Sequence, residues 1–201
     1  MGDGGGMKSY SVGDAIRPHG MCQTHPAAEC PWLAGCAALG NRRQILHSPA
    51  MRIFVHVASQ TLDLIDTSGT LLRRYACSTS KFGTGFEPGS NRTPVGNFRI
   101  AEKHGHDAEP GMIFKGRQPT GEIGSANAAG DHVQTRILWL DGLDTANANT
   151  KERYIYIHGT NAEHLLGTPA SHGCVRLSNQ DMIDLFDTVP EGTEVRIDAG
   201  E

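Results

Sequence analysis

The stretch Met51-Arg52-Ile53-Phe54-Val55-His56-Val57-Ala58 alternates along its length and is rich in β-branched residues. This pattern is typical of a β-strand. It is followed by the stretch Thr61–Asp66, the turn residues Thr67-Ser68-Gly69 and the stretch Thr70–Cys77. Strands separated by short turn signals predict a meander, in which neighbouring strands pair in chain order. We therefore expect a folded core to begin at residue 51.

The first 50 residues show neither the period of a strand nor that of a helix. We expect an irregular N-terminal extension at residues 1–50 and a folded domain at residues 51–198. A zinc site is the structural alternative for the extension, and its ligands would be Cys22, Cys30, Cys36, His19 and His25. Their irregular spacing, without a Cys-x-x-Cys pair, argues against zinc.

The start of the sequence does not match an export signal. Residues 1–6 are acidic and rich in glycine, whereas a signal peptide has a basic start and then an apolar run. Leu33-Ala34-Gly35-Cys36 has the residue order of a lipoprotein cleavage site, but residues 23–31 before it are not apolar. No stretch reaches the roughly 18 consecutive apolar residues of a membrane span. We expect a cytoplasmic protein that is not an integral membrane protein. The periplasm or cell envelope is the alternative if the N-terminus is incomplete.

The composition excludes several classes of protein. Hydrophobic residues make up 38% of the 201 residues and charged residues 20%, which is too apolar for a disordered chain. The formal net charge of −4 gives no positive field to attract phosphates, so nucleic acid is not an expected partner. The five cysteines cannot all pair within one chain, so at least one thiol is expected to be free.

The rest of the sequence is predicted to be mainly β with long loops and one helix. Further strands are expected at Val95–Ala101, Met112–Arg117, Arg136–Leu140, Arg153–Ile157 and Glu194–Ile197. Ser178 can cap a helix that Pro190 and Gly192 stop, and its apolar stripe is Met182, Leu185, Phe186 and Val189. The stretches Lys81–Pro94 and Gly116–Asp131 are read as loops, which serve either as lids or binding loops or as plain surface connections.

A histidine and a cysteine near the C-terminal end carry the candidate chemistry. His158-Gly159 follows a predicted strand, and Ser171-His172-Gly173-Cys174 comes after a spacer. A cysteine attacks as thiolate and, with an ordinary pKa of about 8.5, needs a base at neutral pH. A neutral imidazole on a neighbouring strand can take that proton and return it to a leaving amine. The glycine beside the cysteine lets successive backbone N–H groups converge on an oxyanion.

Other candidates have simpler explanations. Cys77 is expected to be an inert buried thiol. His104, His106 and Asp107 could suggest a metal, but such residues in one glycine-containing loop are more often a solvated turn. His56 alternates within a predicted strand and is expected to be ordinary sheet surface or core.

The segment from His158 to Ser171-His172-Gly173-Cys174-Val175-Arg176 resembles the signature of the L,D-transpeptidase (YkuD-like) catalytic domain family. That signature is a His, a spacer, Ser/Thr-His-Gly-Cys, an aliphatic residue, and Asn or Arg. Thr93-Pro94-Val95-Gly96 also looks like the family's Thr-Pro-x-Gly segment. The resemblance implies an L,D-transpeptidase-like β-sandwich fold for residues 51–198.

The resemblance also implies roles for individual residues. Cys174 would be the nucleophile and His158 the base, oriented by the backbone carbonyl of Gly159. His172 and Gly173 would shape the oxyanion loop. The substrate contacts expected from the resemblance are Arg176, Ser171 and Tyr156, with steadying of the loop as the alternative for Arg176. No metal or organic cofactor is implied.

The implied substrate is the peptidoglycan stem tetrapeptide. Cys174 would attack the bond between the third residue and D-Ala, so that D-Ala leaves and a thioester forms. Carbapenems, which acylate many members of the family, are expected inhibitors. With a cytoplasmic location, water is the favoured acceptor, which is L,D-carboxypeptidase chemistry in muropeptide recycling. The alternative is an amine acceptor, which cross-links two stems in the cell wall. A non-catalytic module that binds wall peptides is a remote alternative, because such a homologue is expected to lose His158 or Cys174.

Overall fold

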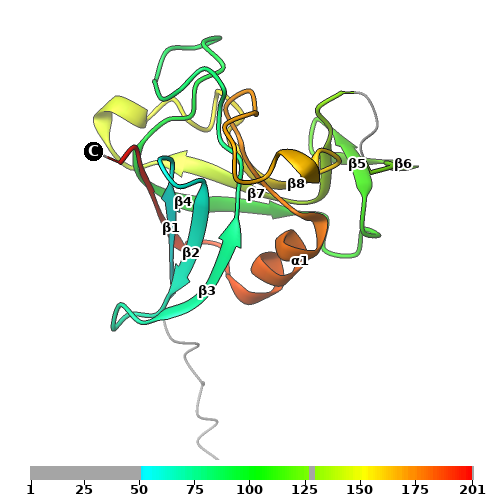
Figure 1. The fold of residues 1–201 in the computed structure, drawn as a ribbon, viewed down its shortest axis with the longest axis horizontal. Coiled ribbons are helices and arrows are strands. Elements are labelled where there is room, and N and C mark those ends of the chain that lie inside the picture. Colours follow the sequence, from blue (N-terminus) through cyan, green and yellow to red (C-terminus); the bar gives the residue numbers. More distant parts are fainter. Residues whose placement is uncertain (1–50, 127–129, 201) are drawn as a thin grey trace, which may run out of the picture. The chain divides into compact units, whose positions relative to one another are not determined.

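The computed structural model describes residues 51–126 and 130–200, and within them the chain forms ten β-strands and one α-helix (Figure 1). The strands are β1 (Arg52–His56), β2 (Thr61–Ile65), β3 (Leu71–Ala76), β4 (Gly96–His104), β5 (Met112–Lys115), β6 (Gln118–Ile123), β7 (Val133–Gly142), β8 (Tyr156–Thr160), β9 (Val175–Leu177) and β10 (Glu194–Asp198). The helix is α1 (Asn179–Thr188), and two single-turn 3-10 helices cover Thr145–Asn147 and Glu163–Leu165. The mainly β fold with one α-helix is therefore confirmed.

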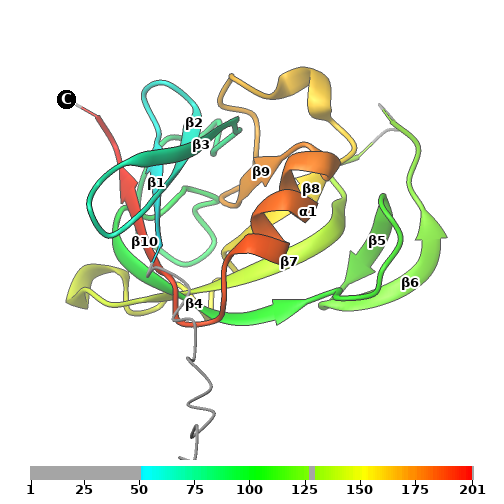
Figure 2. The same ribbon diagram turned by 90° about the horizontal axis from the view of Figure 1, so that it is seen from below.

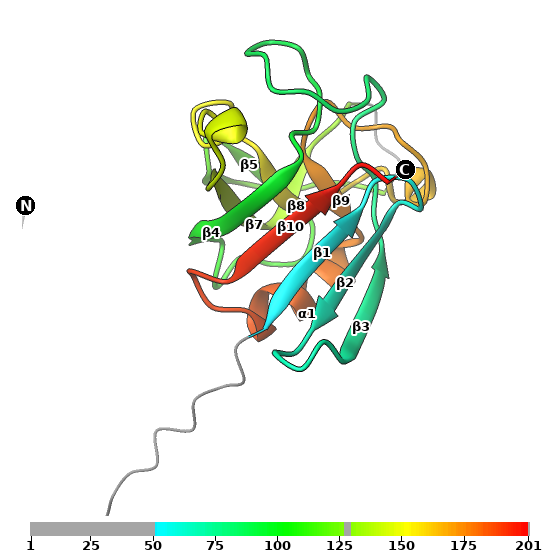
Figure 3. The ribbon, with the colours of Figure 1, turned by 90° about the vertical axis from the view of Figure 1, so that its left-hand side faces the viewer.

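All ten strands belong to one mixed sheet. Its main path runs β3-β2-β1-β10-β4-β7-β5-β6, while β8 pairs with β7 and β9 pairs with β8. The expected meander is present, since β1, β2 and β3 pair antiparallel in chain order. The last strand, β10, lies between β1 and β4, parallel to the first and antiparallel to the second (Figure 3).

The helix begins and ends where the sequence indicates. The Ser178 hydroxyl accepts a hydrogen bond from the backbone N–H of Asp181 at 3.0 Å, which satisfies one donor of the first turn. Its apolar stripe, Met182, Leu185 and Phe186, is fully buried in the main core. The helix packs against β7 and β8, as Figure 2 shows. It therefore covers the core face of β8, the strand that carries His158.

Two predicted boundaries are wrong. The stretch Gly116–Asp131 is not a loop throughout, because β6 occupies Gln118–Ile123 and pairs with β5 as a hairpin. The strand expected at Arg153–Ile157 starts later, at Tyr156, because Tyr154 has a left-handed backbone (φ 57°) and ends a turn. The strand then continues through His158, which lies within β8 and not after it.

In the described part of the chain, no helix is long and apolar enough to cross a membrane. The expectations for residues 1–50 lie outside the described residues. These are the irregular extension, the lipoprotein-like order at residues 33–36, and the zinc alternative at Cys22, Cys30, Cys36, His19 and His25.

Candidate active site

Strands β8 and β9 present the predicted site residues on one face of the sheet. The two strands are parallel, with His158 opposite Arg176. Ile157 and Val175, the residues paired one step earlier, are fully buried in the main core. Successive side chains of a strand point to opposite faces. The other face, here called the site face, therefore carries Tyr156, His158, Cys174 and Arg176.

Backbone groups hold the sulfur of Cys174. The N–H of Tyr156 donates to Sγ at 3.4 Å, and the thiol donates to the carbonyl oxygen of Tyr154 at 3.5 Å. Burial of the sulfur raises the pKa of the Cys174 thiol to about 11, although the residue as a whole is of intermediate exposure. Cys174 is therefore a neutral thiol at neutral pH and requires a base before it can attack.

The imidazole of His158 is buried and has one nitrogen occupied. Its Nδ1 lies 2.7 Å from the carbonyl oxygen of Gly159. A carbonyl oxygen only accepts, so Nδ1 carries the proton and Nε2 carries the lone pair. Burial is the main influence on the pKa of His158 and lowers it, which favours the neutral ring. The orientation by the Gly159 carbonyl expected from the resemblance is present in the structure.

Gly159 also has a steric reason to be glycine. A Cβ at this position would lie 2.5 Å from Oδ1 of Asn179 and 2.9 Å from the carbonyl oxygen of Gln134. Any side chain would force β8 away from β7 or from the start of α1. Close packing at Gly159 therefore fixes the carbonyl that orients His158.

The turn before Cys174 is stabilised by its own hydrogen bonds. Ser171 Oγ donates to the carbonyl oxygen of Cys174 at 2.6 Å and accepts from the N–H of Gly173 at 3.3 Å. Ser171 is 1% exposed, so its hydroxyl has no free surface for a ligand. These contacts give Ser171 a structural role in the turn and argue against the substrate contact expected for it.

Thr93 anchors the peptide unit that joins Gly173 to Cys174. Its hydroxyl donates to the carbonyl oxygen of Gly173 at 3.0 Å and accepts from the N–H of Ser80 at the same distance. In a trans peptide the N–H points away from the carbonyl oxygen. The bond from Thr93 therefore fixes the direction of the Cys174 N–H, one of the donors expected to stabilise an oxyanion. Gly173 itself has φ +121°, a left-handed conformation that favours glycine.

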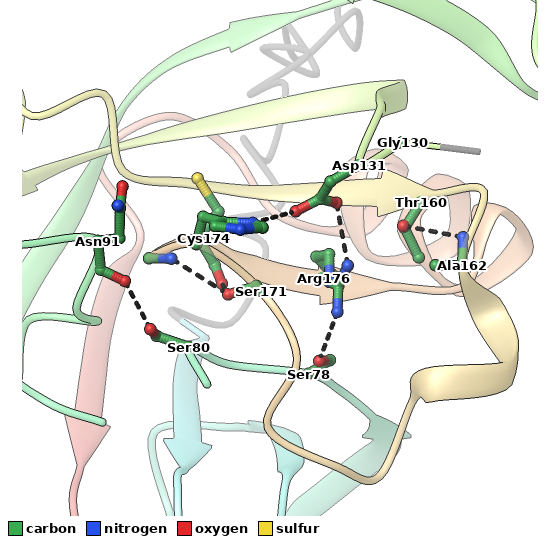
Figure 4. Close-up of polar contacts among 12 residues, drawn as sticks. Ser78, Ser80, Asn91, Gly130, Asp131, Thr160, Ala162, Ser171, Cys174 and Arg176 are labelled. Carbon is green, nitrogen blue, oxygen red and sulfur yellow. Dashed lines mark hydrogen bonds and ion pairs between the residues drawn. The ribbon is translucent and has the colours of Figure 1, made fainter. Parts of the chain in front are cut away.

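Asp131 connects two residues of the motif, His172 and Arg176. Its carboxylate lies 3.1 Å from Nδ1 of His172 and accepts from Nη1 of Arg176 at 2.9 Å. Burial opposes the charge of Asp131, but His172 and Arg176 together hold the pKa of its carboxyl below the usual range. Figure 4 shows the carboxylate reaching Arg176, which in turn reaches Ser78. Sequence reasoning missed Asp131, whose only signal was an acidic residue at the end of a glycine-containing stretch.

Arg176 is 2% exposed, and both of its terminal nitrogens are occupied. Nη1 donates to Asp131 and Nη2 to the hydroxyl of Ser78 at 3.0 Å. Of the two roles that the sequence left open, these contacts favour steadying of the loop over binding of a substrate carboxylate.

The loop at residues 81–94 borders the site. Arg153 donates to the carbonyl oxygens of Gly85 at 3.0 Å and Arg92 at 2.7 Å, which ties the loop to the segment before β8. The ring of Phe82 lies 5.8 Å from that of His172. A cavity of about 270 Å³ lies between this loop and residues 152–155, with His172 in its wall. The loop is thus placed to contact a ligand at the site.

The remaining candidates have local partners. His104 is paired with Glu102 at 3.2 Å, and the ring of His106 meets Phe186 edge-on at 4.9 Å. The part of the chain that the structure describes contains no group of three His, Cys, Asp or Glu side chains arranged to hold a metal ion. His56 lies on the sheet surface with Nε2 3.2 Å from Asp63.

Comparison with known proteins identifies relatives of this arrangement. A family model described as YkuD, L,D-transpeptidase catalytic domain, matches residues 50–197. The Bacillus subtilis protein YqjB, named as an L,D-transpeptidase, is 31% identical over 105 residues, which are 52% of this chain and 51% of the relative. The chain thus matches about half the length of that relative. B. subtilis YkuD, named likewise, is 24% identical over 95% of this chain and 92% of its own. A structure of L,D-transpeptidase 3 from Mycobacterium tuberculosis with a faropenem-derived adduct covers 74% of this chain and 60% of its own, with 19% identity and a TM-score of 0.48.

Proposed function

Because the chain belongs to the family of YkuD L,D-transpeptidase catalytic domains, we propose that it is a cysteine acyltransferase acting on peptidoglycan stem tetrapeptides. The observation that carries the proposal is the pairing of β8 with β9. It places the thiol of Cys174 and the buried, neutral imidazole of His158 on the site face. Nδ1 of His158 is occupied by the Gly159 carbonyl, which leaves Nε2 to accept a proton.

The first half of the reaction forms a thioester. Sγ of Cys174 attacks the carbonyl carbon between the third stem residue and D-Ala while its proton passes to Nε2 of His158. The carbonyl oxygen becomes an oxyanion, and the Cys174 N–H, fixed by Thr93, is one donor for it. The carbon–nitrogen bond then breaks, and His158 returns the proton to the amine of the leaving D-Ala.

The second half transfers the acyl group to an acceptor. His158 takes a proton from the acceptor as it attacks the thioester, and the thiol of Cys174 is restored. The names of the curated relatives support an amine of a second stem as acceptor, which forms a cross-link. Water as acceptor, which an expected cytoplasmic location would favour, remains a prediction that the same experiment tests.

The deciding experiment is incubation of the protein with a disaccharide tetrapeptide, followed by mass spectrometry of the products. Amine transfer yields dimers with loss of one D-Ala for each bond formed, whereas hydrolysis yields the tripeptide without dimer. Cys174→Ala is expected to abolish both products and to leave the fold intact. Cys77→Ala is the matched control and is expected to retain the wild-type rate. Unchanged tetrapeptide with the wild-type protein would overturn the proposal.

Carbapenem acylation gives an independent readout of the first half-reaction. We expect an adduct of one carbapenem on Cys174 by intact-protein and peptide mass. The Cys174→Ala variant should carry none. A wild-type protein that remained unmodified would count against an activated thiol at this position.

A further inference from the structure

Arg117 occupies a backbone position that disfavours arginine. It forms, with Gly116, the two-residue turn between β5 and β6, and both have left-handed backbones, at φ 67° and φ 55°. Turns of this kind favour Gly and Asn, because most other residues with a side chain are disfavoured at positive φ. Residues held in such backbone conformations cluster at functional sites.

The side chain of Arg117 is held over aromatic rings. Its guanidinium carbon lies 4.1 Å from the ring centre of Trp139 and 5.6 Å from that of Tyr154. Those two rings stack at 6.0 Å with an interplanar angle of 18°. Nη1 also donates to the hydroxyl of Tyr156 at 3.3 Å. Three aromatic residues thus restrict the guanidinium to one place and orientation.

Arg117 does not form the close ion pair that a neighbouring cation makes, although Glu102 acts on it at longer range. Lys151, which lies 4.8 Å from the same Trp139 ring, is paired with Glu102 at 2.8 Å. Within residues 51–126 and 130–200, Arg117 makes no ion pair with a carboxylate. A guanidinium has five N–H donors in a planar fork, and the Tyr156 hydroxyl uses one nitrogen. The remaining donors can bind an anion in two-pronged fashion.

Two tyrosines connect this guanidinium to the sulfur of Cys174. Tyr156 contacts Arg117 through its hydroxyl and Cys174 through its backbone N–H. Tyr154 lies under Arg117 with its ring and accepts from the Cys174 thiol with its carbonyl oxygen. Each tyrosine thus contacts both the guanidinium and the attacking sulfur. A peptide held at Cys174 would therefore lie beside the tyrosines that carry the guanidinium.

We propose that Arg117 binds a carboxylate of the acyl-donor peptide adjacent to the scissile bond, which makes it a specificity-determining residue. This inference rests on the proposed function. Two carboxylates of the donor fit: the C-terminal carboxylate of the leaving D-Ala, and a side-chain carboxylate on the third residue, as in diaminopimelate. Both present the same anion to the guanidinium, and the site selects donors that carry it.

The test measures binding to a protein that cannot turn over. In a Cys174→Ala background, calorimetry gives the Kd of three tetrapeptides: unmodified, amidated at the C-terminus, and amidated at the third side chain. We expect Arg117→Gln to weaken binding of the unmodified peptide about tenfold. One of the two amidated peptides lacks the bound carboxylate, and its Kd should not change with Arg117→Gln. That peptide identifies which of the two carboxylates Arg117 binds. Arg52→Gln, an exposed arginine on β1 that is paired with Glu194, is the matched control.

Several outcomes would overturn the inference. Equal weakening of all three peptides by Arg117→Gln would show that the residue only supports the hairpin. An unchanged Kd for every peptide, or no binding of the unmodified peptide, would also refute it. With Arg117 intact, amidation of the bound carboxylate should itself weaken binding. This comparison tests the inference even if the Arg117→Gln variant folds poorly. Binding that depends on Arg117, without turnover by the wild-type protein, would refute the proposed function and leave the carboxylate site standing.

Discussion

Cys174 and Cys77 are two free thiols in different surroundings. Cys77 is fully buried in the main core, and burial raises its pKa to about 12. The burial expected for Cys77 from the sequence is confirmed, and its lack of reactivity stays a prediction. Cys174 reaches the surface, but burial of its sulfur raises its pKa to about 11. Neither thiol is ionised at neutral pH. The two differ in exposure to solvent, since Cys77 is buried and Cys174 is partly exposed.

This difference predicts the course of alkylation by iodoacetamide. Because the thiolate reacts and its fraction grows tenfold per pH unit below the pKa, labelling of Cys174 should accelerate steadily from about pH 6 to about pH 9, without a plateau. Cys77 should remain unlabelled in the folded protein. Peptide mass mapping at each pH follows the two thiols separately from the other three cysteines. A plateau near neutral pH would instead show a thiolate–imidazolium pair with His158.

Thr93 provides a second prediction for a single residue. Thr93→Val removes the donor to the Gly173 carbonyl and the acceptor for the Ser80 N–H while keeping the shape of the side chain. We expect carbapenem acylation of Cys174 to slow by about tenfold, because the direction of an oxyanion donor is no longer fixed. Thr93→Ser keeps the hydroxyl and should acylate at close to the wild-type rate. Wild-type rates for the valine variant would show that this bond does not position the loop.

At the scale of elements, helix α1 depends on one capping side chain. Ser178→Ala removes the acceptor for the backbone N–H of Asp181. We expect the free energy of unfolding to fall by about 1 kcal/mol, measured by urea denaturation. Ser178→Asp retains an acceptor at the same position and should restore most of the loss. A stability equal to wild type in the alanine variant would mean that this end of the helix is held by packing alone.

The elements that sequence patterns predicted are those whose burial alternates or follows one helical stripe. The strand β1 and the helix α1 have such patterns and were located to within two residues. The strand β6 has every residue exposed and contains Pro119 and Gly121, so no apolar period marks it. Its pairing with β5 comes from the turn at Gly116 and Arg117, where an arginine stands in a position typical of glycine or asparagine.

The site residues also divide into those that a local sequence pattern predicted and those that no local pattern marks. Cys174, His158 and Gly159 lie in short contiguous motifs, and the resemblance assigned them together. Asp131 and Arg117 come from other segments and reach the motif only because β7 pairs with both β8 and β5. Pairing between distant strands is a property of the whole sheet, so local sequence patterns could not indicate these contacts.

At the scale of the whole molecule, the sheet depends on its last strand. β10 is the only link between β1 and β4 in the strand order of the described residues. We expect a variant that ends at residue 193 to lose cooperative unfolding and to aggregate, because two long sheet edges become unpaired. Removal of residues 199–201 leaves β10 intact and should preserve the thermal transition. A cooperative transition in the shorter variant would show that the two parts of the sheet fold separately.

The central position of β10 also constrains when the domain can fold during synthesis. Strands β1 to β3 emerge from the ribosome first, and β4 to β9 follow, yet their joint sheet requires residues 194–198, which are translated after both groups. Until then the nascent chain presents unpaired strand edges, which are the features that chaperones protect from association. Ribosome-associated chaperones should therefore stay bound to this domain until β10 has left the exit tunnel.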